Sequence, residues 1–157
     1  MESKDAGALT GEPFQDVGTV AREHYLNGFG CAESILHALN DTGTLDVPDI
    51  VLKASTGFGT GFGGKGSTCG AVTGPIMAVG IKYGRLKPDE DSDNAYKRTK
   101  KIADTYEQKY KTTDCACVTK VWRDRGKFTT PERRKFCGAI VRYMARETEK
   151  ILSKDEA

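Results

Sequence analysis

Five cysteines are the residues of this sequence with the clearest capacity for chemistry: Cys31, Cys69, Cys115, Cys117 and Cys137. A thiolate is the nucleophile of disulfide exchange and a ligand for soft metals, whereas a buried thiol can simply pack as a small apolar group. The spacing of these cysteines matches neither paired zinc knuckles nor a ferredoxin cluster motif. Any shared site must therefore be assembled from distant parts of the chain.

Two of the cysteines are predicted at the N-terminal ends of helices. Cys31 follows a glycine and begins a helical pattern, and Cys69 begins the apolar segment 69–81. The unpaired N–H groups and the dipole of a helix N-terminus favour thiolate over thiol. The pair Cys115 and Cys117 is expected at a helix end, and Cys137 lies at the flank of the core stripe of the last helix. The four regions can converge on one site.

The segment 57–66 contains six glycines in ten residues and matches two nucleotide-binding motifs incompletely. Gly66 occupies the position where the Walker A motif needs a serine or threonine hydroxyl for magnesium. Both motifs also require a preceding β-strand, and the sequence shows no strand pattern there. A nucleotide-binding enzyme that uses Lys65 is therefore the weakest of the alternatives.

Ordering so many glycines is entropically costly, which indicates that the backbone of this loop must approach another group closely. We expect N–H groups of the segment 63–67 to point toward the Cys69 sulfur and to stabilise its thiolate or metal-bound form. The backbone positions expected to bind a cofactor around Cys69 are Gly63, Gly64, Gly66 and Gly70.

Hydrophobic periodicity predicts an all-α fold, a compact bundle of about five to seven helices with the glycine-rich loop before a buried central helix. A single cysteine-containing domain is expected over residues 14–152, with flexible ends at 1–13 and 153–157. The last helix has the clearest start, because Thr130 can cap it and Pro131 suits its first position. The small residues Gly70, Gly74 and Ala78 on one face of the central helix favour close helix packing, some of it in a homodimer.

Composition excludes several classes of partner. The 157 residues are 38% hydrophobic with a mean hydropathy of −0.51, and the formal net charge is only +2. These values argue against membrane insertion and against nucleic acid as a partner. The segment 1–14 has no apolar stretch of signal-peptide length, so a cytoplasmic location is expected. The basic clusters at 97–101 and 133–135 are interpreted as solvated helix faces.

The order of these features resembles the C-GCAxxG-C-C family, and the likeness runs from about Val17 to Ile151. The features are a cysteine after a glycine, the glycine-rich loop, the block from Cys69 to Gly74 and two later cysteines. The resemblance implies a small bacterial or archaeal protein with four characteristic cysteines and a redox role. It matches those cysteines to Cys31, Cys69, Cys115 and Cys137 and leaves Cys117 as an extra cysteine. Pro75 departs from the small residue that the resemblance implies at that position.

Two redox chemistries remain open for the four cysteines. They can act as a dithiol/disulfide centre without a cofactor, or four of the five cysteines can hold an iron–sulfur cluster or another thiolate-bound metal. We slightly favour the metal or cluster, because four thiols exceed what one exchange reaction needs. Either chemistry predicts an oxidoreductase or electron-transfer protein with an unknown redox partner. The alternative is a structural zinc-binding or interaction protein without redox chemistry.

Overall fold

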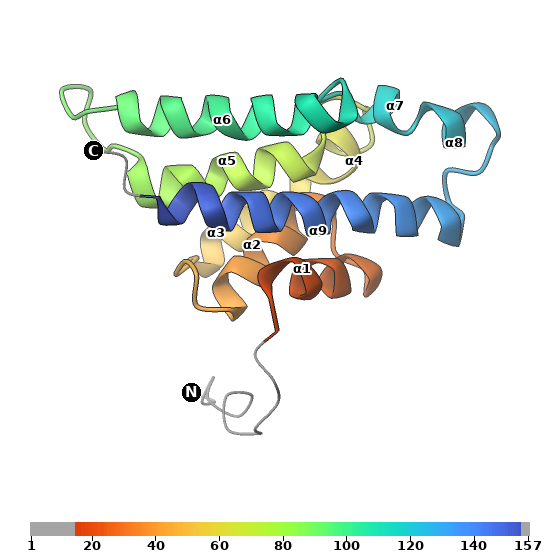
Figure 1. The fold of residues 1–157 in the computed structure, drawn as a ribbon, viewed down its shortest axis with the longest axis horizontal. Helices are drawn as coiled ribbons and strands as arrows, with labels where there is room; N and C mark the ends of the chain where they lie inside the picture. The colour runs from red at the N-terminus through yellow and green to blue at the C-terminus, as the bar shows by residue number, and fades with distance from the viewer. Residues whose placement is uncertain (1–14, 155–157) are drawn as a thin grey trace.

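The computed structural model describes residues 15–154, and every regular element in this range is helical (Figure 1). The elements are α1 (Val17–Leu26), α2 (Cys31–Asp41), α3 (Asp49–Ala54), the 3-10 helix η1 (Ser55–Phe58), α4 (Gly59–Phe62), α5 (Gly70–Tyr83), α6 (Asp93–Tyr110), α7 (Cys115–Val118), α8 (Lys120–Asp124) and α9 (Pro131–Ser153). Six of these helices have six or more residues, so the predicted all-α bundle is confirmed. The segment 1–13 lies outside the described residues, and α9 includes Ser153.

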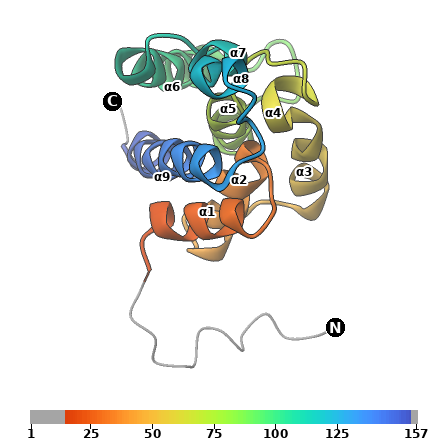
Figure 2. The same ribbon diagram turned by 90° about the vertical axis from the view of Figure 1, so that its right-hand side faces the viewer.

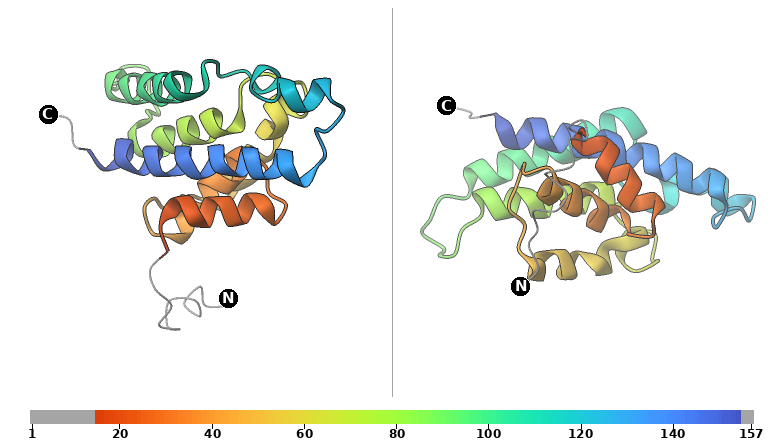
Figure 3. Two further views of the ribbon diagram at one scale, coloured as in Figure 1. Left: turned by 45° about the vertical axis from the view of Figure 1, so that its right-hand side comes forward. Right: turned by 90° about the horizontal axis from the view of Figure 1, so that it is seen from below.

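Helix α9 runs the length of the molecule and contacts α1, α2, α5 and α6 (Figures 1 and 3). Helix α5 lies between α2 and α6 and is the buried central helix that the sequence predicts. The largest fully buried side chains come from all the long helices and include Leu36, Val79, Ile102, Tyr106 and Met144. Within the described range, no helix is both long and apolar enough to cross a membrane.

The small-residue face of α5 packs against α2. A Cβ atom at Gly74 would lie 2.8 Å from the Ala32 Cα, and a Cβ atom at Gly70 would lie 2.8 Å from the Cys31 Cβ. Real Cβ atoms do not approach other atoms so closely, and glycine is therefore required at both positions. The predicted close packing is confirmed, but it occurs within the chain. The homodimer expected from the same face stays a prediction.

Helix α9 begins as predicted, with the Thr130 side chain accepting a hydrogen bond from the Arg133 N–H and Pro131 as the first helical residue. Hydrophobic periodicity predicts a core stripe on this helix that begins with Phe136, and the buried face differs from that stripe in detail. Phe136 is exposed at the edge of the bundle, with its ring 6.1 Å from that of Trp122, whereas Cys137 is buried. Because α9 packs against four helices, its buried face must be wider than a single stripe.

Arg98 contradicts the interpretation of the 97–101 cluster as a wholly solvated face, because it is only 3% exposed. Its guanidinium group donates hydrogen bonds to the carbonyl oxygens of Ile151 and Lys154 and lies 4.1 Å from the ring centre of Tyr83. Arg98 thus binds the carbonyl groups left unpaired at the end of α9. Lys97 and Lys100 are exposed, as predicted.

Candidate functional site

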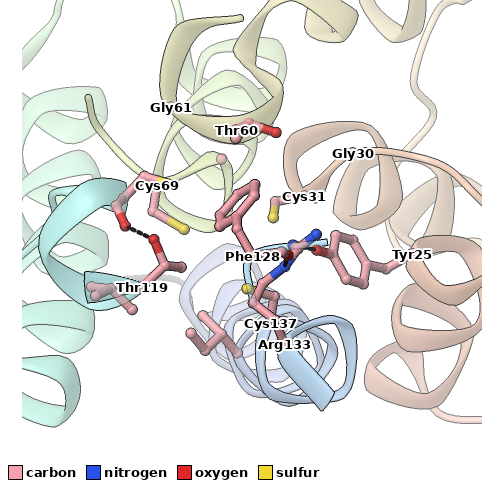
Figure 4. A pocket seen from close by; sticks show the side chains of 14 residues that line it. Tyr25, Gly30, Cys31, Thr60, Gly61, Cys69, Thr119, Phe128, Arg133 and Cys137 are labelled. Atoms are coloured by element: carbon pink, nitrogen blue, oxygen red, sulfur yellow. Dashed lines mark hydrogen bonds between the residues drawn. The ribbon is translucent and has the colours of Figure 1, made fainter. Parts of the chain in front are cut away.

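Four of the five cysteines line one pocket at the end of the bundle where α2 and α5 begin (Figure 4). They are Cys31, Cys69, Cys115 and Cys137. The first three lie at or next to helix N-termini, and Cys137 lies in the second turn of α9. Cys117 is exposed and does not line the pocket. The cavity volume is about 40 Å³, far below the 300 Å³ or more of a typical organic-ligand site.

Cys31 is the first residue of α2, whose start is fixed by Glu33. One carboxylate oxygen of Glu33 accepts a hydrogen bond from the Gly30 N–H at 2.9 Å, and the other accepts one from the Thr56 hydroxyl at 3.0 Å. The Glu33 side chain therefore satisfies an N–H group that the helix leaves unpaired. It also ties the beginning of α2 to the segment that leads into the glycine-rich loop.

Cys69 and Cys115 are brought together by pairing of two short extended segments. The N–H of Cys69 donates to the Thr113 carbonyl at 2.8 Å, and the N–H of Cys115 donates to the Ser67 carbonyl at 2.7 Å. Thr68 and Asp114 form an antiparallel bridge between these bonds. Each cysteine then begins or caps a helix, with Cys69 as the N-cap of α5 and Cys115 as the first residue of α7.

The glycine-rich loop allows this close pairing. Gly61 and Gly66 both have positive φ angles, of 63° and 79°. A Cβ atom on Gly61 would lie 2.8 Å from the Cys115 Cβ, and one on Gly66 would lie 2.9 Å from the Ala116 Cβ. Any larger residue at these two positions would displace the segment that carries Cys115.

The N–H groups of the loop are not directed at the Cys69 sulfur as expected. Those of Gly63, Gly66 and Ser67 donate instead to carbonyl groups of the same loop, at 2.9, 3.3 and 3.0 Å. A tightly turned loop must satisfy its own polar groups, and this requirement uses up the donors. Of the four expected cofactor-binding positions, Gly70 lines the pocket, whereas Gly63, Gly64 and Gly66 do not. The N–H group that stabilises a Cys69 thiolate is that of Ala71, in the first turn of α5.

Cys31 and Cys69 form a hydrogen-bonded pair of unequal acidity. Their mutual hydrogen bond is the main reason why the pKa of Cys69 falls to about 7. The Tyr106 hydroxyl and the Ala71 N–H act in the same direction, while burial opposes them. The same hydrogen bond, together with burial, raises the pKa of Cys31 well above its ordinary value. At neutral pH about half of the Cys69 side chains are therefore thiolate, whereas Cys31 keeps its proton.

Cys115 and Cys137 each lie beside an arginine but remain protonated. Burial raises the pKa of both thiols, and the adjacent guanidinium groups offset only part of this effect. The Arg123 Nη2 atom lies 3.9 Å from the Cys115 Sγ atom, and Arg133 is close enough to Cys137 to lower its pKa. The pocket thus contains one acidic thiol and three thiols of raised pKa.

Phe128 lines the pocket near Arg133 (Figure 4), and both arginines lie against its ring. Each guanidinium carbon, that of Arg123 and that of Arg133, lies 4.3 Å from the centre of the Phe128 ring. Arg133 also donates to the Tyr25 hydroxyl at 2.7 Å. The interpretation of the 133–135 cluster as a solvated face is therefore wrong for Arg133. The sequence did not predict this packing of Arg123 and Arg133 against Phe128, because only tertiary structure brings α8 and α9 to the Phe128 ring.

The comparison with known protein families agrees with this geometry. The family model described as "Putative redox-active protein (C_GCAxxG_C_C)" matches residues 29–151, which is well over half of the chain. The chain belongs to this family. No curated protein and no solved structure matches it. Membership in the C_GCAxxG_C_C family supports a redox role and leaves the chemistry to be argued from the pocket.

The four pocket cysteines are not grouped as a set of metal ligands in the described part of this C_GCAxxG_C_C protein. Across residues 15–154, no group of three or more Cys, His, Asp or Glu side chains is placed to hold a metal ion. The pocket instead contains one hydrogen-bonded thiol pair and two thiols that lie beside arginines. The thiolate-bound cluster expected from the sequence stays a prediction, and no step proposed below uses a metal.

Tyr106 is a residue of this site that sequence reasoning placed only on a helix stripe. It is fully buried, its hydroxyl has no hydrogen-bond partner among the described residues, and it lies close enough to Cys69 to lower the pKa of that thiol. The unpaired Tyr106 hydroxyl can donate to Cys69 when that thiol loses its proton. Tyr106→Phe is therefore expected to raise the pKa of Cys69 by about one pH unit, because a hydrogen bond to a charged group contributes about 1.5 kcal/mol or more. The pH dependence of Cys69 alkylation measures this change.

The matched control is Tyr110→Phe. The Tyr110 ring lies 4.9 Å from that of Tyr106, but no hydrogen bond joins it to Cys69. An equal effect of the two substitutions would show that ring packing, rather than the Tyr106 hydroxyl, sets the acidity of Cys69.

Proposed function

We propose that this protein is a thiol–disulfide oxidoreductase in which Cys31 and Cys69 form the redox couple. The observation that carries the proposal is the closeness of these two thiols in one pocket, one at the start of α2 and the other at the start of α5, where each shifts the pKa of the other. The close approach of Gly70 to Cys31 brings the two helix ends into contact. Membership in a redox-active family supports the same class of chemistry.

Cys69 is the proposed nucleophile. A thiol reacts fastest with disulfides when its pKa lies near the ambient pH, because a much lower pKa weakens the thiolate as a nucleophile. Its pKa of about 7 meets this condition, whereas burial raises the pKa values of Cys115 and Cys137. The latter two are assigned no covalent step.

The proposed reaction oxidises the protein dithiol and reduces a substrate disulfide. The Cys69 thiolate attacks one substrate sulfur, so that a mixed disulfide forms and the other substrate sulfur leaves as a thiolate. Cys31 gives its proton to that leaving thiolate and then attacks the Cys69 sulfur. This second step forms the Cys31–Cys69 disulfide and releases the remaining substrate sulfur, which takes a proton from solvent. In total, two electrons pass from the protein to the substrate. One proton comes directly from Cys31, and the other comes from solvent, to which Cys69 had lost its own proton before the attack.

The pH dependence of alkylation tests the proposal in protein that has been purified anaerobically and reduced. We expect the alkylation rate of Cys69 to be half-maximal near pH 7 and to rise as its thiolate forms. Cys115 and Cys137 should react slowly at that pH, since burial keeps them protonated. In the unfolded chain all the cysteines should titrate near the ordinary thiol pKa of about 8.5.

Two results would contradict this proposal. One is a folded-state titration of Cys69 at the ordinary thiol value. The other is a stoichiometric metal that protects the cysteines, which would favour the cluster if it absorbs visible light and a structural zinc site if it is colourless.

A further inference from the structure

Positive charge is concentrated in a segment of the chain that helps to line the cysteine pocket. Residues 120–135, called the basic segment here, contain seven basic and two acidic residues and carry a net charge of +5. The whole chain carries only +2, so the remaining residues are net negative. The basic segment comprises α8, the following loop and the start of α9, which Figure 2 shows at the end of the molecule that faces the viewer. It supplies Phe128 and Arg133 to the pocket.

Much of this charge is available to a partner. Arg125, Lys127 and Lys135 are exposed and form no salt bridge with any residue in the described range. Lys120 pairs with Asp124 of the same helix at 2.7 Å, and such an exposed pair is weak. A cluster of unpaired like charges costs stability, which an anionic partner would relieve.

Exposed apolar side chains occur next to pocket-lining residues and within the basic segment. Eight large apolar residues are exposed in the range 15–154. Five of them are sequence neighbours of pocket-lining residues or belong to the basic segment itself: Leu26, Phe29, Phe62, Val121 and Phe136. Four of them are next in sequence to a residue that lines the pocket, and Val121, in α8, is two residues from the pocket-lining Thr119. Exposed apolar residues with charged neighbours are typical of protein-binding surfaces.

The pocket itself restricts how a substrate disulfide can reach Cys69. The cavity of about 40 Å³ has room for a sulfur-bearing side chain but not for a large ligand. Cys69, Cys115 and Cys137 are each no more than 8% exposed. The disulfide must therefore be presented by a protruding part of a larger molecule. Among anionic macromolecules, a protein is the class that carries disulfides.

We propose that the basic segment and its apolar neighbours dock an acidic protein, which presents a disulfide to the Cys31–Cys69 couple. This inference rests on the proposed function and names the class of its substrate. The opposite charges of the two proteins would accelerate their encounter, and the apolar residues would hold the complex once formed.

Two probe peptides of opposite charge test this docking. Each contains one cysteine activated as a neutral thiopyridyl disulfide, flanked by glutamates in one peptide and by lysines in the other. At low ionic strength, the reduced protein should release thiopyridine at least about tenfold faster from the acidic peptide, because steering of this kind changes association rates by 10-fold or more. Added salt should reduce the difference.

The charge-reversal variant Arg125→Glu/Lys127→Glu should lose the preference for the acidic peptide. Both side chains are exposed and neither belongs to the couple, so the variant should fold and keep the Cys69 alkylation profile. The matched control Lys87→Glu/Lys97→Glu makes the same charge change in the α5–α6 connection and the start of α6, at the opposite end of the bundle (Figure 1). It should retain the preference.

Equal rates with the two peptides, or equal effects of the two double variants, would overturn the inference while leaving the redox couple intact. Tight binding of duplex DNA or of anionic lipid vesicles, lost in Arg125→Glu/Lys127→Glu, would assign the basic segment to a nucleic acid or a membrane instead. Failure to react with either peptide would contradict the proposed function itself, and the docking inference with it.

Discussion

Cys69→Ser is expected to reduce disulfide exchange to the background rate, because it removes the only thiol of the pocket whose pKa favours a thiolate at neutral pH. Cys31→Ser should behave differently. A serine hydroxyl can still donate a hydrogen bond to the Cys69 thiolate, so the first attack should proceed, but the mixed disulfide should then accumulate. Stopped reactions analysed by mass spectrometry distinguish the two outcomes.

The remaining cysteines provide matched controls for these substitutions. Cys117 is exposed outside the pocket, and Cys117→Ser should leave the exchange rate unchanged. Cys115→Ser and Cys137→Ser should keep the ability to form a disulfide, since neither thiol takes part in the proposed steps. Loss of all exchange in Cys115→Ser or Cys137→Ser, with Cys69 still titrating near pH 7, would move the couple to a different pair.

Gly74→Ala is expected to destabilise the fold by about 1–3 kcal/mol, which is the usual cost of forcing an extra carbon into a closely packed interface. The new Cβ atom would lie 2.8 Å from the Cα and 2.9 Å from the carbonyl oxygen of Ala32, and backbone atoms cannot rotate away. The substitution should also separate the beginnings of α2 and α5 and so weaken the Cys31–Cys69 hydrogen bond. Urea unfolding measures the first effect, and the pH profile of Cys69 alkylation measures the second.

Gly80→Ala is the matched control in the same helix. A Cβ atom at Gly80 would meet no other heavy atom within 4 Å, so the substitution should stabilise the protein by up to about 1 kcal/mol through helix propensity alone. Opposite signs for the two substitutions would show that α2–α5 contact, rather than helix propensity, requires glycine at Gly74. A stabilising effect of Gly74→Ala would contradict the packing that holds the two cysteines together.

The sequence predicted the helices because local patterns specify them. The N-cap at Thr130, the proline after it and the apolar segment that begins at Cys69 each depend on neighbouring residues alone. The placement of Cys31 and Cys69 at helix N-termini could be predicted for the same reason. Their mutual contact could not be derived from spacing, and was expected only from the convergence of four cysteine regions.

The parts of the site that could not be predicted depend on contacts between distant segments. The glycine-rich loop satisfies its own N–H groups and makes room for Cys115, a role that depends on the pairing of segments 66–69 and 113–116. Arg133 looked like a surface charge because its sequence neighbours are charged, yet it binds Tyr25 and flanks Phe128. Periodicity alone also could not identify Tyr106 as the partner of the Cys69 sulfur.

Mapping the first disulfide that forms during graded oxidation tests the central claim most directly. Reduced protein is equilibrated with increasing ratios of oxidised to reduced glutathione, its remaining thiols are alkylated, and the cross-linked peptides are identified by mass spectrometry. The account predicts that the first disulfide joins Cys31 to Cys69, while Cys115, Cys117 and Cys137 are alkylated. A first disulfide between any other two cysteines, or a pocket protected from oxidation by a bound metal, would contradict it.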